Sequence, residues 1–367
     1  MVDTFAHGAP QETIDVHQHL LGEPLIEALA RRTAAPRLIA RPEGWTFRVA
    51  AEPDSILAVE ATDAELRRAD LEADGIDRAL VALSTALGIE TLPVEEAAEL
   101  VEAHHRGLEG LPVEFRGWGA VPLAGPEPDP AAVDAALDRG CVGVTLPATA
   151  LADPARVEWV APLLARLEER DAPLFVHPGP VIDPATLGRV PSGGASAGRA
   201  YGASLAGAPV DRARAGRAAA ASSSSRLPHW WPALTDYVAQ MQAAWFAFLH
   251  AGRPAHPRLR VLFAMLAGGA PLQLERYAAR RGVPAPAPDP LVFYDTSSYG
   301  PQMIGAMAAA VGAPQLVYGS DRPVVDPRAA DRHQAWPDPD LRQALLAANP
   351  ARLLNHESNH DPKGALA

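Results

Sequence analysis

Residues 13–20 read TIDVHQHL, a short apolar stretch that ends in two histidines. Its length and its β-branched residues predict a β-strand, in which side chains two residues apart point to the same face. His17 and His19 therefore project together from the end of this strand, where they could bind one cation. A pair of structural histidines is the alternative, and the rest of the chain decides between the two.

Seven further apolar runs alternate with alanine- and leucine-rich amphipathic stretches. The runs lie at residues 77–84, 115–122, 141–147, 173–177, 259–265, 291–296 and 315–320. Helices are expected at 64–74, 94–108, 130–139, 154–170, 232–250, 271–281 and 338–348. Alternating strands and helices are typical of βα units around a parallel sheet, and eight units can close into a barrel. The sequence therefore predicts an α/β fold, a (β/α)8 TIM barrel.

One domain is expected to span the whole chain, residues 1–367. Two connections, after the first and fifth strands, are too long for ordinary loops and cover residues 22–60 and about 180–232. Both leave the carboxyl ends of strands, where barrels hold their active sites, so both are candidate lids. The second contains the low-complexity run RARAGRAAAASSSS, and a C-terminal tail starts at about residue 356.

Composition excludes several classes of function. With 32 basic and 44 acidic residues the net charge is −12, which would repel nucleic-acid phosphates and anionic lipids. The one cysteine cannot form an internal disulfide, and no apolar stretch approaches the roughly 20 residues of a membrane span. We expect a cytoplasmic protein with a small-molecule substrate and no nucleic-acid or membrane partner.

Two more residues complete a candidate metal site. His177 ends the fifth strand in PLFVHPGP, and Asp321 follows the eighth in VYGSDRP. Alone, each would be assigned to the core or to a turn, but the carboxyl ends of strands one, five and eight of a barrel face one cavity. Three imidazoles and a carboxylate suit one divalent ion, with zinc expected, at about 2.0–2.2 Å per ligand. This joint placement favours a metal site over structural histidines.

These motifs together resemble the amidohydrolase superfamily. The HxH pair His17 and His19, His177 and the GSDxP motif around Asp321 are similar to its amidohydrolase-related branch, which includes aminocarboxymuconate semialdehyde decarboxylase and several aromatic acid decarboxylases. The resemblance spans roughly residues 13–354. It implies a metal-dependent barrel with one catalytic zinc or similar ion, and a homodimer. Lys363 is the only lysine, which agrees with this branch, because the binuclear branches use a carbamylated lysine on strand four.

The sixth strand departs from the family pattern. A histidine followed by a glycine-rich turn is usual there, whereas MLAGGAP at residues 265–271 places Met265 at the histidine position. A thioether cannot relay a proton. The role of that histidine in orienting and deprotonating metal-bound water must therefore be vacant, taken by Asp321, or filled by His229 or His250. We favour Asp321, since His250 is expected on a helix surface and His229 lies in the second candidate lid, from which it could reach inward.

Substrate-binding residues are expected around the same cavity. Arg322, Met265 and His229 are the candidates. An arginine at the rim could bind a substrate carboxylate through two hydrogen bonds, although a salt bridge to a helix is an equal alternative for Arg322. Tyr294 and Asp295, which end the seventh strand, are weaker candidates to border the cavity. His104 and His105, on the helix after the second strand, are expected to face solvent.

Three functions follow from these residues. The leading hypothesis is a hydrolase that activates water on one metal to cleave a C–N or C–O bond in a small molecule, with Asp321 accepting the water proton and returning it to the leaving group. The alternative, implied by the resemblance, is a metal-dependent decarboxylase of a small unsaturated or aromatic acid. The absent strand-six histidine weakens it, since the related decarboxylases use that residue for proton handling. A non-catalytic ligand-binding barrel is the third hypothesis, with Met265 its only support.

Overall fold

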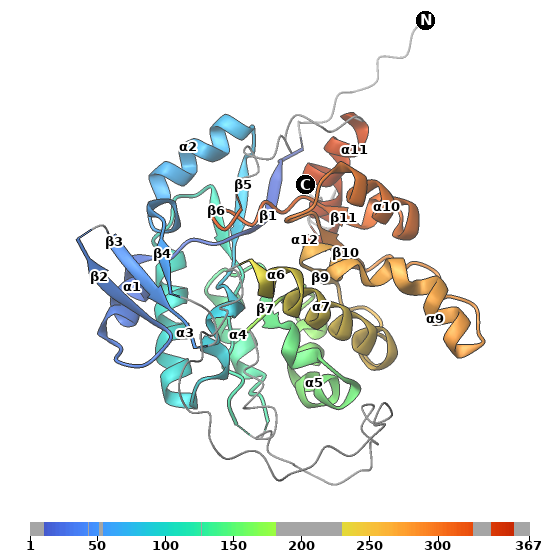
Figure 1. The fold of residues 1–367 in the computed structure, drawn as a ribbon, viewed down its shortest axis with the longest axis horizontal. Coiled ribbons are helices and arrows are strands. Elements are labelled where there is room, and N and C mark those ends of the chain that lie inside the picture. Colours follow the sequence, from blue (N-terminus) through green and yellow to red (C-terminus); the bar gives the residue numbers. More distant parts are fainter. Residues whose placement is uncertain are drawn as a thin grey trace, which may run out of the picture.

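Eight parallel strands surround the centre of the molecule and confirm the predicted (β/α)8 barrel (Figure 1). The computed structural model describes residues 11–42, 44–50, 54–125, 127–180, 230–325 and 339–355. The barrel strands all lie within the runs expected from the sequence. They are β1 (Ile14–Gln18), β5 (Arg78–Val81), β6 (Phe115–Gly117), β7 (Val144–Pro147), β8 (Leu174–His177), β9 (Val261–Phe263), β10 (Val292–Asp295) and β11 (Leu316–Val317).

Backbone hydrogen bonds close the barrel between two groups of strands. One group has the order β1-β5-β6 and the other the order β11-β10-β9-β8-β7. Val16 N donates to Tyr318 O over 2.9 Å at one junction, and Gly119 N donates to Gly143 O over 2.8 Å at the other. An isolated parallel bridge also pairs Gln18 with Arg322. The first and last strands are thus neighbours, which places their carboxyl ends side by side.

Helices cover the outside of the barrel, and most of them bury part of their surface. Their bounds are α1 (Glu23–Arg31), α2 (Ala64–Asp74), α3 (Val94–Glu109), α4 (Ala131–Asp138), α5 (Pro154–Glu169), α6 (Trp231–Leu234), α7 (Asp236–Ala247), α8 (Arg253–Ala255), α9 (Leu274–Arg281), α10 (Pro301–Val311), α11 (Pro339–Gln343) and α12 (Asn349–Leu354). Strands that are buried on both faces need apolar residues throughout, which is why they read as continuous apolar runs. Among the described residues, no helix is both long and apolar enough to cross a membrane.

The first candidate lid, residues 22–60, contains secondary structure that the sequence did not predict. It contains α1 and a small antiparallel sheet of β2 (Arg37–Arg41), β3 (Gly44–Arg48) and β4 (Ser55–Leu57). Leu25 and Leu29 of α1 pack with Leu38 of β2 and Leu100 of α3 in a second core cluster. Figure 1 shows this sheet beside α1 and α3 at one side of the barrel. Its strands escaped prediction because they are short, half exposed and rich in arginine.

Other expectations met a mixed outcome. Helix α10 was not expected, and Gly305 lowers its helix propensity although its alanines favour a helix. Most of the second candidate lid, at 181–229, and the C-terminal tail, at 356–367, lie outside the described residues.

The expectation that His104 and His105 face solvent is wrong. Their exposed fractions are 3% and 5%. His104 Nε2–H donates to Trp118 O over 3.2 Å, and His105 Nε2 accepts from Ala120 N over 3.1 Å. Burial lowers the pKa of His104 to about 3 and that of His105 to about 4, so both rings are neutral. The pair ties α3 to the segment that follows β6.

Glu90 lies in the 3-10 turn Ile89–Thr91 between β5 and α3. Burial shifts its pKa upward, whereas burial shifts the pKa of the two histidines downward. Glu90 is fully buried, and neither carboxylate oxygen bonds to another residue in the part of the chain that the structure describes. Burial raises its pKa to about 8. The unfolded chain ionises at this group near pH 4.5 while the folded protein keeps the proton. The pH-dependent contribution of Glu90 to stability is therefore most favourable below pH 4.5 and is lost as the pH rises toward 8.

Replacing Glu90 by glutamine removes this titration. We expect Glu90→Gln to raise the free energy of unfolding by roughly 2–3 kcal/mol at pH 7 and much less at pH 5. Urea unfolding of both proteins at the two pH values measures the difference. Glu95→Gln, at an exposed position of α3, is the matched control and should show no such pH dependence. A Glu90→Gln effect of equal size at both pH values would contradict the raised pKa.

Candidate metal site at the carboxyl ends of the strands

Four predicted residues come together where the strands of the barrel end. His17 and His19 extend from β1, His177 is the last residue of β8, and Asp321 follows β11. One ligand atom from each of them lies within 4.8 Å of all the others. The three imidazoles are buried, while Asp321 keeps 14% of its side chain exposed. We call this group the His–Asp cluster.

The Nδ1 atom of each histidine in the cluster is held by an acceptor behind it. His17 Nδ1–H donates to Asp295 Oδ2 over 2.7 Å, and His19 Nδ1–H donates to Ala82 O over 2.9 Å. His177 Nδ1–H donates to Pro178 O over 2.8 Å, with Thr85 Oγ1 beside it. An acceptor at Nδ1 places the proton there and leaves the Nε2 lone pair free. All three rings are thus prepared as Nε2 ligands.

The geometry of these lone pairs suits a cation. His17 Nε2 and His19 Nε2 lie 3.2 Å apart, and Asp321 Oδ1 lies 3.2 Å from His19 Nε2 and 3.6 Å from His17 Nε2. With the proton of each ring on Nδ1, these atoms are all acceptors and repel one another unless a positive charge lies between them. Imidazole nitrogen with carboxylate oxygen is a donor set typical of zinc and of other divalent first-row ions. The residues present therefore fit a single divalent ion.

Charge within the cluster makes ion binding depend on pH. Burial by itself lowers the pKa of His17, but the charge of Asp295 and its hydrogen bond outweigh burial and raise the pKa to about 9. Burial and the neighbouring His17 and His19 lower the pKa of His177 well below its usual value. The ligands of an ion must be deprotonated, so the raised pKa of His17 means that protons compete with the ion at this ring. Ion affinity should therefore fall as the pH decreases.

Asp295 holds His17 in place, a role that its position in the sequence did not predict. It is fully buried, and while Oδ2 holds His17, Oδ1 accepts from Met265 N over 3.0 Å and from Ser297 N over 2.9 Å. This carboxylate orients a cluster residue rather than bordering the cavity. The available signal was an acidic residue at the carboxyl end of a barrel strand, the same signal that identified Asp321.

Met265 begins an unusual turn at the end of β9. Residues 265–269 all have φ between 50° and 73°, although the first three are Met, Leu and Ala. Left-handed backbone costs a non-glycine residue about 1–2 kcal/mol, so neighbours must hold the turn. Gln242 of α7 donates to Gly268 O over 2.8 Å, and a Cβ at Gly268 would lie 2.7 Å from Val238 O. Met265 itself is buried, with 8% of its surface exposed.

The other candidates differ in outcome. The Arg322 guanidinium pairs with Asp70 at 3.2 Å and with Asp74 at 2.7 Å on α2, the salt-bridge role weighed above. Its binding of a substrate stays a prediction. His250 is exposed, as expected, in the π-helical turn after α7. His229 lies outside the described residues.

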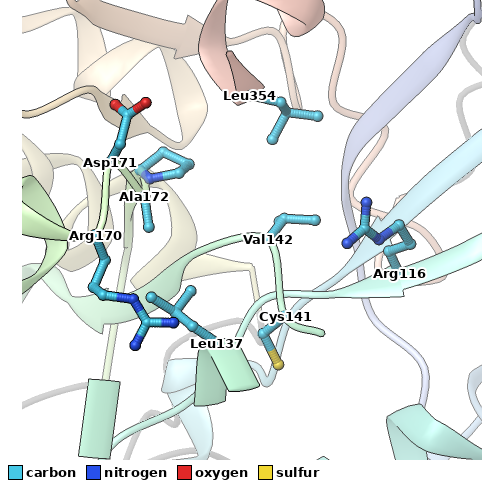
Figure 2. A pocket seen from close by; sticks show the side chains of 9 residues that line it. Arg116, Leu137, Cys141, Val142, Arg170, Asp171, Ala172 and Leu354 are labelled. Atoms are coloured by element: carbon cyan, nitrogen blue, oxygen red, sulfur yellow. The ribbon is translucent and has the colours of Figure 1, made fainter. Parts of the chain in front are cut away.

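A cavity of about 230 Å³ lies at the opposite end of the barrel (Figure 2). Its lining includes Cys141 and Val142, which precede β7, and Ala172 and Pro173, which precede β8. It therefore opens near the amino ends of the strands and is separate from the His–Asp cluster.

Comparison with known proteins supports the fold. No family model and no curated protein matches the sequence. IDCase from Metarhizium anisopliae is 17% identical, with a TM-score of 0.67 over 94% of this chain and 97% of that one. 5-Carboxyvanillate decarboxylase from Sphingomonas paucimobilis is 16% identical, with a TM-score of 0.63 over 94% and 99%. 2,6-Dihydroxybenzoate decarboxylase from Rhizobium is 16% identical, with a TM-score of 0.60 over 95% and 99%. The chain is thus similar to these barrels over nearly its whole length.

The geometry of the cluster predicts the metal content of the protein. We expect about one divalent ion per chain of untagged wild-type protein by plasma mass spectrometry, and loss of that ion in His177→Ala, because three ligands bind more weakly than four. His250→Ala replaces an exposed histidine and serves as the control. Equal metal content in wild-type protein and His177→Ala would contradict the ligand assignment.

Proposed function

We propose that the protein is an enzyme of the amidohydrolase-related type that uses one divalent ion held by His17, His19, His177 and Asp321. The observation that carries the proposal is the convergence of three Nε2 atoms and a carboxylate oxygen, with every Nδ1 committed to an acceptor. Zinc is the proposed ion. Manganese is the alternative, since a similar 5-carboxyvanillate decarboxylase from Novosphingobium aromaticivorans was solved in complex with manganese.

The proposed reaction is the non-oxidative decarboxylation of a small unsaturated or aromatic acid. The sequence alone ranked hydrolysis first, and the structural comparisons favour the alternative. Decarboxylases act on 5-carboxyvanillate and 2,6-dihydroxybenzoate in barrels that match this chain over more than nine-tenths of its length. Identities of 16% leave the particular acid open.

A bound ion would supply positive charge that orients the acid and stabilises negative charge developing on it. The chain must then handle one proton, because cleavage of the C–C bond releases carbon dioxide and leaves an electron pair on a carbon that takes up a proton. Asp295 is committed to His17, and Met265 carries no exchangeable proton on its side chain. Asp321 is a carboxylate at the cluster and is partly exposed, so we assign it the proton.

Hydrolysis is the second candidate. One of the similar structures is named amidohydrolase II, and it is 18% identical with a TM-score of 0.64. In that reaction Asp321 would accept a proton from water and pass it to the leaving group. A small-molecule substrate, a homodimer and a cytoplasmic location stay predictions from the sequence.

A substrate panel separates the two reactions. We expect carbon dioxide release from at least one acid among 2,6-dihydroxybenzoate, 5-carboxyvanillate and related compounds, and no turnover of amides or lactones. Asp321→Asn should lower kcat by roughly 10²–10⁴-fold, because the amide cannot carry the proton. The metal content of this variant is measured in parallel, so that loss of the ion is not mistaken for loss of proton transfer. Turnover of amides or lactones alone would reverse the ranking, and full activity of metal-loaded Asp321→Asn would overturn the role of Asp321.

A further inference from the structure

Helix α2 places a buried arginine directly behind the His–Asp cluster. Arg67 has 1% of its surface exposed, whereas its neighbour Arg68 is exposed and pairs with Glu65. Taking a guanidinium out of water is costly unless its donors find well-placed partners. The identity of the partners therefore shows what Arg67 holds in place.

Those partners include the two residues that follow His17. Arg67 Nη1 donates to His19 O over 3.1 Å and to Glu60 O over 3.3 Å, and Nη2 donates to Gln18 Oε1. The amide of Gln18 also contacts Asp15, because its Nε2 donates to Asp15 Oδ2 over 2.7 Å. One guanidinium thus fixes both the backbone and the intervening side chain of the HxH segment.

Asp15 extends the network to the last strand of the barrel. Its Oδ1 accepts from His17 N over 3.1 Å and from Ser320 N over 3.0 Å, one residue before Asp321. Asp321 N donates to His17 O over 2.9 Å. The segments that carry three of the four cluster residues are therefore joined through buried polar groups.

A second arginine attaches the same helix to the Asp321 segment. Arg322 pairs with Asp70 and Asp74, one and two turns along α2 from Arg67. Its carbonyl oxygen accepts from His19 N over 2.7 Å. Helix α2 thus holds the end of β1 through Arg67 and the residues after β11 through Arg322.

We propose that Arg67 is a positioning residue of the metal site, which fixes His17 and His19 at the separation from Asp321 that a divalent ion requires. The inference rests on the proposed metal-dependent function. Hydrogen bonds behind a ligand shell orient the ligands, and their loss typically weakens metal binding by about 10–100-fold. Arg67 acts one step further back, through the backbone of His19 and the side chain of Gln18.

The test compares Arg67 with the adjacent arginine. Affinity for Zn²⁺ is measured by competition with a chelator for wild-type protein, Arg67→Met and the matched control Arg68→Met. We expect Arg67→Met to bind Zn²⁺ about 10-fold or more weakly and Arg68→Met to bind within twofold of wild type. The visible spectrum of the Co²⁺-substituted proteins should change in Arg67→Met alone, because its intensity reports the coordination geometry. A purely structural role would lower the unfolding temperature of the apo-protein without altering either readout.

Arg67→Lys keeps the test decisive if Arg67→Met does not fold. Lysine retains the charge and can reach His19 O, but it cannot hold Gln18 at the same time. We expect its Zn²⁺ affinity to lie between those of Arg67→Met and wild type, and below that of Arg68→Lys. Folded Arg67 variants that keep wild-type Zn²⁺ affinity and an unchanged Co²⁺ spectrum would overturn this inference and leave the proposed function standing. Failure of wild-type protein to bind Zn²⁺ or Mn²⁺ would overturn the proposed function, and this inference with it.

Discussion

The site depends on where three imidazole protons are held. Asp295, Ala82 O and Pro178 O each accept from an Nδ1 atom, and this leaves the Nε2 lone pairs of His17, His19 and His177 facing a common point. Lone pairs at such distances repel, so the arrangement is favourable only around a positive charge. The acceptors come from three different strand ends, which means that the barrel itself specifies which nitrogen of each ring is free.

Closure of the barrel supplies the remaining constraint. Because β1 lies next to β11, the HxH segment and the residues around Asp321 are bound to each other by backbone and by buried side chains. Asp15 bridges the two segments, and α2 holds both from outside through Arg67 and Arg322. Burying a charged group costs desolvation free energy. Here the buried charges of Asp15, Arg67 and Arg322 lie between two segments that are distant in the sequence and must be held at a fixed separation.

The cluster residues could be predicted from the sequence because each of them marks the end of a recognisable strand. Strand ends in a barrel converge, so the positions of His17, His19, His177 and Asp321 along their strands were enough to bring them together in prediction. Sequence reasoning missed groups whose role depends on the partner that folding supplies. Asp295 has its role because folding buries it and brings His17 to 2.7 Å from its carboxylate. Arg67 and Arg68 are adjacent identical residues, and the winding of α2 alone decides which is buried. The sheet β2-β3-β4 was missed because its strands are short and half exposed, and its apolar residues find their partners on α1 and α3 only in the folded protein.

Met265 shows that the backbone and the side chain at one position can have separate roles. The turn it begins is held in left-handed geometry across five residues, and its amide donates to the carboxylate that orients His17. That contribution comes from the backbone amide, so it does not require the thioether of Met265. The site can therefore keep its ion-binding geometry while lacking a proton-transferring group on this strand. In the proposed reaction the proton is therefore assigned to Asp321, whose φ of 60° is the left-handed conformation that aspartate tolerates better than most side chains.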